Sequence, residues 1–195
     1  IIIIAKNETR LTNILFGEVW LCSGQSNMQQ PVKGFTAQPT FEGSNAIIHA
    51  KNPNLRLFTV NRTGSSTPLK DLDSFVSWEE SSPELVSEFS AVGYFFAGQL
   101  QEILDVPVGI IHTSWGASLV EAWMSEEVLS RYQNVDLSGI NEETRMNRTQ
   151  TALFNAMLHP LIPYTLKGFL WYQGESNRPK PEEYKALFPA MVQDW

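Results

Sequence analysis

Short, continuously apolar segments alternate with helical patterns along most of this chain, and no other feature limits the possible folds as strongly. The apolar segments at residues 18–22, 108–112 and 167–173 have the length and composition of buried strands. Apolar residues recur at helical spacing after Ser90, a plausible N-cap, and again after Pro181. This alternation predicts an α/β fold in which helices cover both faces of a parallel sheet.

The remaining segments give weaker patterns. Residues 1–5 are predicted to form a strand, and residues 6–13 a turn with a second short strand. The stretch 61–90 is rich in Ser, Thr and Pro, which predicts mostly loop. After a turn at residues 113–118, a second helical pattern continues through Met124 and Leu129, and residues 151–163 are predicted to form a helix with a connector.

Composition argues against several classes of protein. The net charge is −7 at pH 7 and Lys and Arg do not cluster, so no nucleic-acid partner is expected. No apolar segment is long enough to span a bilayer. The single cysteine, Cys22, excludes an internal disulfide and is expected to be a buried hydrophobe. Asn-x-Thr sequons at Asn7, Asn61 and Asn147 weakly favour a secretory route.

Each of the three predicted strands ends in a turn that contains glycine and polar side chains. These turns are residues 24–28, 114–118 and 173–177. Ligands of open α/β sheets sit outside the carboxyl ends of the strands, so we expect the three turns to converge on one crevice. Ser26 would begin a helix there, with its hydroxyl beside free backbone N–H groups that stabilise a developing oxyanion.

The residues of these turns also have ordinary structural interpretations. Ser26 alone is typical of a helix N-cap, Gly116 of a turn, and Glu175 of a solvated carboxylate. The agreement of three strand-end turns favours a site without deciding the matter. In such a site, Gln173 or Asn177 could donate a side-chain N–H to the same oxygen.

Three segments, in order, carry a family resemblance: GEVWLCSGQSNM from residue 17, SWGAS..EAW from residue 114, and FLWYQGESN from residue 169. Together they resemble the sialate O-acetylesterase branch of the SGNH hydrolases, which includes carbohydrate acetylesterases and acetylxylan esterases. The resemblance implies a three-layer α/β/α, flavodoxin-like fold. It also implies a serine nucleophile at Ser26 and hydrolysis of acyl esters without a metal or other cofactor.

The resemblance also assigns roles within the three turns. The oxyanion hole would use the backbone N–H groups of Ser26 and Gly116 together with the side chain of Gln173. Glu175 would support the site or orient a histidine. The substrate, an acetylated sugar of the sialic acid or xylan type, would contact Gln25, Asn27, Trp115 and Asn155.

Two departures from the family pattern stand out. The family's usual Gly-Gly-Thr is Gly-Ala-Ser at residues 116–118, and the Asp-x-x-His motif that supplies its base does not occur. His112 ends a strand on the correct edge of the sheet and is the best internal substitute. His49 and His159, like His112 itself, are expected to be structural, because a catalytic base must be oriented as well as close.

These departures shape the expected domain organisation. Residues 1–16 are expected to end a preceding β-rich region or to form a lead-in strand. Residues 17–195 are expected to form an esterase domain that stops before its last strand and helix, so that this segment alone would be inactive. The resemblance implies a secreted, periplasmic or lysosomal location, and the oligomeric state is left open.

Two other functions remain open. One is a general esterase or thioesterase of the same superfamily that acts on lipid-like esters. The other is a carbohydrate-binding protein that keeps the serine turn without hydrolysis, and the absent Asp-x-x-His motif favours it.

Overall fold

The computed structural model describes residues 2–4, 8–72, 76–141 and 143–195. Strands are labelled β, α-helices α, and 3₁₀ or π segments η. In chain order they are β1 (Ile2–Ile4), β2 (Glu8–Arg10), β3 (Glu18–Gly24), α1 (Ser26–Gln29), α2 (Gly43–Ile48), β4 (Asn52–Thr59), β5 (Glu79–Ser81), α3 (Pro83–Glu88), α4 (Ala91–Leu104), β6 (Val108–Ser114), η1 (Val120–Trp123), α5 (Glu126–Leu129), η2 (Met146–Arg148), η3 (Phe154–Leu158), η4 (His159–Leu161), β7 (Gly168–Tyr172), η5 (Glu175–Asn177) and α6 (Pro181–Asp194).

A five-stranded sheet with the order β5-β4-β6-β3-β7 forms the centre of the molecule. β4, β6, β3 and β7 run parallel, and only β5, at one edge, is antiparallel to its neighbour. Gly24 at the end of β3 is level with Ser114 on β6 and Tyr172 on β7. The predicted parallel sheet is therefore confirmed, and its three predicted strands are adjacent and end at the same level.

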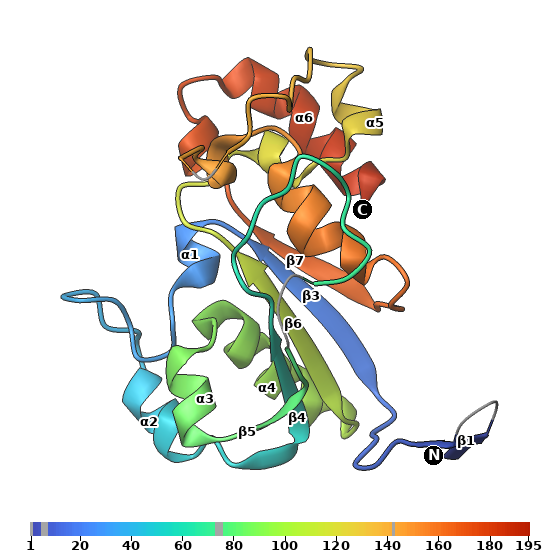
Figure 1. Ribbon diagram of the computed structural model, residues 1–195. Coiled ribbons are helices and arrows are strands. Elements are labelled where there is room, and N and C mark those ends of the chain that lie inside the picture. Colours follow the sequence, from blue (N-terminus) through green and yellow to red (C-terminus); the bar gives the residue numbers. More distant parts are fainter. Residues whose placement is uncertain (1, 5–7, 73–75, 142) are drawn as a thin grey trace.

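Alternate residues of the central strands point into different cores. Cys22 and Ile110 pack with apolar side chains of α1, α3 and α4 on one face of the sheet. Leu21 and Ile111 pack with η1 and η3 on the other face, where the aromatic rings of β7 also meet Trp195. Figure 1 shows these two groups of helices on opposite sides of the sheet, which confirms the three-layer α/β/α arrangement.

The strand order differs in one respect from the predicted flavodoxin-like arrangement. Numbered by their order in the chain, the parallel strands lie in the order 2-3-1-4, whereas flavodoxin has 2-1-3-4-5. The segment after β3 covers one face of the sheet and the segment after β6 covers the other. The boundary between these adjacent strands is therefore the switch point at which open α/β sheets bind ligands.

The local sequence patterns predicted some secondary-structure elements correctly and missed others. α4 begins as predicted at Ser90, whose hydroxyl accepts a hydrogen bond from the Gly93 N–H at 3.2 Å. The segment 61–90 is not all loop, because it contains β5 and α3. β4 was not among the predicted strands.

The helical pattern predicted from the 113–118 turn through Met124 and Leu129 is not one continuous helix. The structure has the short segment η1 and then, separately, α5. Asp194 at the end of α6 accepts hydrogen bonds from the backbone N–H and the hydroxyl of Ser125, at 2.7 Å each. Ser125 then caps α5, so a tertiary contact resets the helix.

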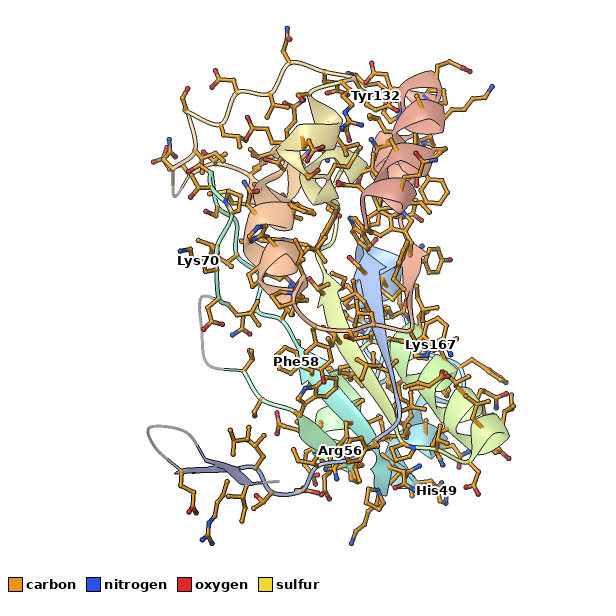
Figure 2. The ribbon with its side chains drawn as sticks, turned by 90° about the vertical axis from the view of Figure 1, so that its right-hand side faces the viewer. His49, Arg56, Phe58, Lys70, Tyr132 and Lys167 are labelled. Atoms are coloured by element: carbon orange, nitrogen blue, oxygen red, sulfur yellow. The ribbon has the colours of Figure 1, made fainter. Side chains whose placement is uncertain are left out.

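The amino-terminal strands β1 and β2 pair with each other, apart from the five-stranded sheet. The segment that follows, with residues 163–167 and Arg56, lines a cavity of about 910 Å³ at the amino end of the parallel strands. Figure 2 shows Arg56 at the end of the molecule opposite Tyr132. This cavity is thus at the opposite end of the parallel strands from the three strand-end turns.

Candidate active site

The three strand-end turns are joined to one another by backbone hydrogen bonds. The N–H of Gln25 donates to the carbonyl of Tyr172, and the N–H of Trp115 donates to the carbonyl of Gly24, each at 3.0 Å. Gly24 has a φ of +144°, a conformation that side chains disfavour, and it turns the chain from β3 into α1. The turns therefore lie together at the carboxyl edge of the sheet, where α1 stands at the end of β3 (Figure 1).

Ser26 is the first residue of α1 and is half-buried. A Cβ placed on Gly116 would lie 3.8 Å from the Cβ of Ser26, so the turns after β3 and β6 face each other closely. In the described part of the chain, the Ser26 hydroxyl has no hydrogen-bond partner. It is thus open to a base and to a substrate.

The two amides that frame this serine bind the turn after β7. Glu175 accepts a hydrogen bond from Gln25 Nε2 at 2.9 Å and another from Asn27 Nδ2 at 3.0 Å. The side-chain oxygen of Gln25 accepts from the N–H groups of Gly174 and Ser176, at 3.3 and 3.2 Å. The side-chain N–H groups of Gln25 and Asn27, which were predicted to contact the substrate, therefore donate to Glu175 here, and Glu175 links the side chains on both sides of Ser26.

Both the backbone N–H and the backbone carbonyl of Gly116 form hydrogen bonds. Its N–H donates to Gln29 Oε1 at 2.7 Å, and its carbonyl accepts from Asn147 Nδ2 at 2.7 Å. The N–H that the resemblance assigns to the oxyanion hole thus already donates to a side-chain oxygen. The sequence did not point to a role at this turn for Gln29 or for Asn147, which was noted only as a sequon, because both reach the turn through the tertiary fold.

The side chain of Gln173 lies in a buried network below the turns. Its Nε2 donates to the Ser118 carbonyl at 3.0 Å and to Asn177 Oδ1 at 2.7 Å. Asn177 also accepts from the Val120 N–H and donates to Glu121 Oε2 at 2.8 Å. Both candidate amides are therefore engaged, and the oxyanion role predicted for Gln173 requires the exchange of one of these bonds.

Two further predicted residues have different positions. Trp115 is half-buried in the turn itself and packs against the core on the face of the sheet that contains Leu21 and Ile111. Asn155 is only 2% exposed, and its side chain donates to the Ser65 carbonyl at 3.2 Å. Its own carbonyl accepts from the Leu69 N–H. Asn155 therefore holds the segment after β4, and none of its hydrogen bonds reaches the three turns.

Each of the three histidines has a partner other than Ser26. His112 Nε2 lies 2.6 Å from Ser114 Oγ, inside the sheet. His49 Nδ1 lies 2.9 Å from the Asn45 carbonyl, and the same atom of His159 lies 2.8 Å from a backbone carbonyl of residue 69. Within the described residues, none of these rings is hydrogen-bonded to the serine.

His112 should make the stability of the protein depend on pH. Burial, with a smaller contribution from the charge of Arg62, lowers the pKa of His112 from 6.5 to about 4. The unfolded chain binds the proton more readily than the folded protein. The contribution of the neutral His112 ring to the free energy of unfolding is therefore complete above pH 6.5 and is lost as the pH falls from 6.5 through 4. Between pH 7 and 5, the free energy of unfolding should fall by about 2 kcal/mol more in the wild type than in His112→Gln. Urea unfolding of both proteins at the two pH values measures the difference, and equal falls would contradict a buried neutral imidazole.

The fold and the serine turn define an α/β protein with a candidate site at the switch point of a parallel sheet. The chain belongs to the family described as carbohydrate esterase, sialic acid-specific acetylesterase, whose model matches residues 16–195.

The chain is similar to sialate O-acetylesterases of Homo sapiens and Mus musculus, at 37% and 31% identity over 95% of its length. It covers 36% and 40% of those proteins. A carbohydrate acetylesterase from Xanthomonas citri, known from its crystal structure, has 37% identity and a TM-score of 0.78. That match covers 92% of this chain and 38% of the other. A protein from Arabidopsis thaliana, at 17% identity and a TM-score of 0.50, shares the fold over 90% of this chain and 66% of its own.

Two kinds of feature are absent from the described residues. No helix there is both long and apolar enough to cross a membrane. Likewise, no three His, Cys, Asp or Glu side chains of that part of the chain gather in a way that could hold a metal ion.

Proposed function

We propose that the protein is a serine esterase that removes O-acetyl groups from carbohydrates, with Ser26 as the nucleophile. The observation that carries the proposal is the position of Ser26. Its unpartnered hydroxyl lies at the switch point of the sheet, against the Gly116 turn and between amides held by Glu175. Its relatives named as sialate O-acetylesterases and carbohydrate acetylesterase support the class of substrate.

The reaction would proceed by two acyl transfers. Ser26 Oγ attacks the acetyl carbonyl while a base takes its proton, and the oxyanion accepts hydrogen bonds from the N–H groups of Ser26 and Gly116. Collapse of the intermediate breaks the bond to the sugar oxygen, which receives the proton from the base. Water then attacks the acetyl-serine while the base takes a proton from it, and the bond from the acyl carbon to Ser26 Oγ breaks. Oγ receives the proton back from the base, and acetate is released. Gln29 Oε1, which now accepts from the Gly116 N–H, would give way to the oxyanion.

The base would come from another part of a longer protein. All three histidines of this chain make other contacts, and the chain spans only 36% of the human relative. A serine without its base is a weak nucleophile at neutral pH. Residues 1–195 alone would therefore hydrolyse esters far more slowly than the full-length protein.

The secretory location expected from the sequence is part of the proposal. Asn61, the acceptor residue of the second sequon, is exposed. Asn147 is a poor acceptor, because its side-chain nitrogen donates to the Gly116 carbonyl, and a glycan there would remove that bond from the site.

We expect the full-length protein to release acetate from an O-acetylated sugar and to react with a fluorophosphonate at Ser26. Peptide mass spectrometry locates the label, and an acetate assay with O-acetylated sialic acid and acetylated xylan measures hydrolysis. Labelling at another residue would remove Ser26 from the mechanism. A preference for long-chain esters would favour a general esterase. Binding of an acetylated glycan without acetate release would favour a carbohydrate-binding protein.

A further inference from the structure

Gly116, whose N–H the proposed reaction uses, lies in a turn that other groups must hold in shape. A glycine has no side chain, so its two peptide groups rotate more freely than those of other residues. The next residue, Ala117, has a φ of +59°, a left-handed conformation that costs free energy when a side chain is present. Without further contacts, the turn would relax and the Gly116 N–H would no longer point toward α1.

Two side-chain amides hold the peptide groups on either side of Gly116. Gln29 Oε1 accepts a hydrogen bond from the Gly116 N–H, and Asn147 Nδ2 donates one to the Gly116 carbonyl, each at 2.7 Å. Both distances are short for N–H···O hydrogen bonds, which are commonly about 2.9 Å long. The two amides therefore restrict both peptide groups of the residue that supplies the oxyanion donor.

Gln29 differs from Asn147 because it belongs to the same short helix as Ser26. α1 begins at Ser26, and Gln29 follows three residues later, so both side chains lie on one face of the helix. A Cβ on Gly116 would lie 3.8 Å from the Cβ of Ser26 and 3.0 Å from Gln29 Oε1. The Gln29 hydrogen bond thus connects the helix of the candidate nucleophile directly to the turn of the oxyanion donor.

The oxygen of Gln29 also lies where this N–H would bind the substrate. A carbonyl oxygen that becomes an oxyanion must lie about 2.7–3.1 Å from its donor nitrogen. Gln29 Oε1 is itself a carbonyl oxygen at 2.7 Å from the Gly116 nitrogen. When the substrate oxygen takes this place, the half-buried Gln29 amide can bond to water instead, so one hydrogen bond replaces another.

We propose that Gln29 is a positioning residue, which holds the Gly116 N–H toward α1 in the free protein and releases it to the oxyanion. The donor would then already be oriented when negative charge develops, which is the condition for strong electrostatic stabilisation. The proposal rests on the proposed function of Ser26 and adds a residue that supports the same reaction.

Replacing Gln29 by methionine, which is similar in size and a much weaker acceptor, tests this role in the full-length protein. We expect kcat for acetate release to fall by roughly tenfold while KM changes less than about twofold, because the ester binds before the oxyanion forms. Inhibition by a boronic acid, which forms a tetrahedral anion on serine, should weaken by the same factor. A loss confined to stability, with kcat and boronate inhibition unchanged, would overturn the proposal.

The matched control is Gln30→Met, at the next position of the chain. The side chain of Gln30 donates to Thr40 Oγ1 at 3.2 Å, so it contacts a different segment. This variant should keep the wild-type kcat and the wild-type inhibition by the boronic acid. An equal loss of kcat in Gln30→Met and Gln29→Met would mean that the contact with Gly116 has no special role.

Gln29→Glu tests where the oxyanion forms. Glutamate keeps an acceptor oxygen next to the Gly116 N–H, but its negative charge would repel an oxyanion at the same place. We expect kcat to fall by a factor on the order of 100, more than in Gln29→Met. A hydrogen bond with a purely structural role would be restored by glutamate, so a Gln29→Glu variant more active than Gln29→Met would overturn the proposal.

Hydrogen exchange of the Gly116 amide, followed by mass spectrometry, tests the contact without catalysis. In the full-length protein, this amide should exchange at least about tenfold faster in Gln29→Met than in the wild type or in Gln30→Met. Unchanged exchange would overturn the proposal even if Ser26 is the nucleophile. If Ser26→Ala keeps its turnover although exchange depends on Gln29, the proposed function fails and Gln29 holds the turn without a role in catalysis.

Discussion

Replacing Ser26 by alanine in the full-length protein should reduce the rate of acetate release by a factor on the order of 10⁶. The variant removes the oxygen that forms the acyl-enzyme, and the remaining backbone N–H groups and binding contacts leave only residual catalysis. Ser26 is half-buried and its hydroxyl has no partner within the described residues, so the fold should not change. Acetate release at saturating substrate measures the effect, and circular dichroism checks the fold.

The matched control is Ser130→Ala. Ser130 is an exposed serine at the end of α5 whose hydroxyl donates only to the carbonyl of Glu127. Its turnover should equal that of the wild type, and its reaction with a fluorophosphonate should persist. Turnover that survives in Ser26→Ala would mean that another residue attacks the ester, and the mechanism proposed here would be wrong.

Replacing Gly24 by alanine should destabilise the protein by about 3 kcal/mol and move Ser26 as well. The new Cβ would lie 2.2 Å from the carbonyl oxygen of Tyr172, and the φ of +144° is strained for any side chain. The β3–β7 pairing would have to open at the point where the serine turn begins. Thermal unfolding should show a lower Tm, and the acetate assay a lower kcat.

Gly98→Ala provides the matched control for this substitution. Gly98 lies within α4, and a Cβ there would meet no atom within 4 Å. Alanine should therefore stabilise the helix by roughly 0.5–1 kcal/mol. If Gly24→Ala unfolds at the same temperature as the wild type, the close approach of β3 and β7 does not restrict residue 24.

Local sequence patterns were sufficient wherever a structure depends on neighbouring residues. The Ser90 cap bonds Gly93, three residues along the chain. In the helix that follows, the recurring apolar residues Val92, Phe96 and Leu100 pack against the core as predicted, whereas Ile103, near the end of the helix, is exposed. β3 and β6 were predicted because segments buried on both faces must be apolar throughout. Each extends two residues beyond its predicted end, because the apolar run gives way to Ser, Thr and Gly that still pair in the sheet.

The candidate site was only partly predictable, because its turns are local in the sequence but its hydrogen bonds join residues far apart in the chain. The three glycine turns were visible in the sequence, and the topology of a parallel sheet predicted that they converge at its carboxyl edge. Their hydrogen bonds were not visible, because Gln29 reaches Gly116 across 87 residues and Asn147 reaches it across 31. Asn155 looked like a cleft residue, yet it binds Ser65 across 90 residues.

The sequence by itself determined the class of fold, the strands that carry the turns, and the serine that begins α1. Helix hydrogen bonds, caps and apolar periodicity join residues close in the chain, so the local sequence contains them. The tertiary structure alone decided that β3 lies between β6 and β7, that Glu175 fixes Gln25 and Asn27, and that two side-chain amides hold Gly116. Gln25 and Glu175 are 150 residues apart, and only the packing of the whole sheet brings such groups within hydrogen-bonding distance.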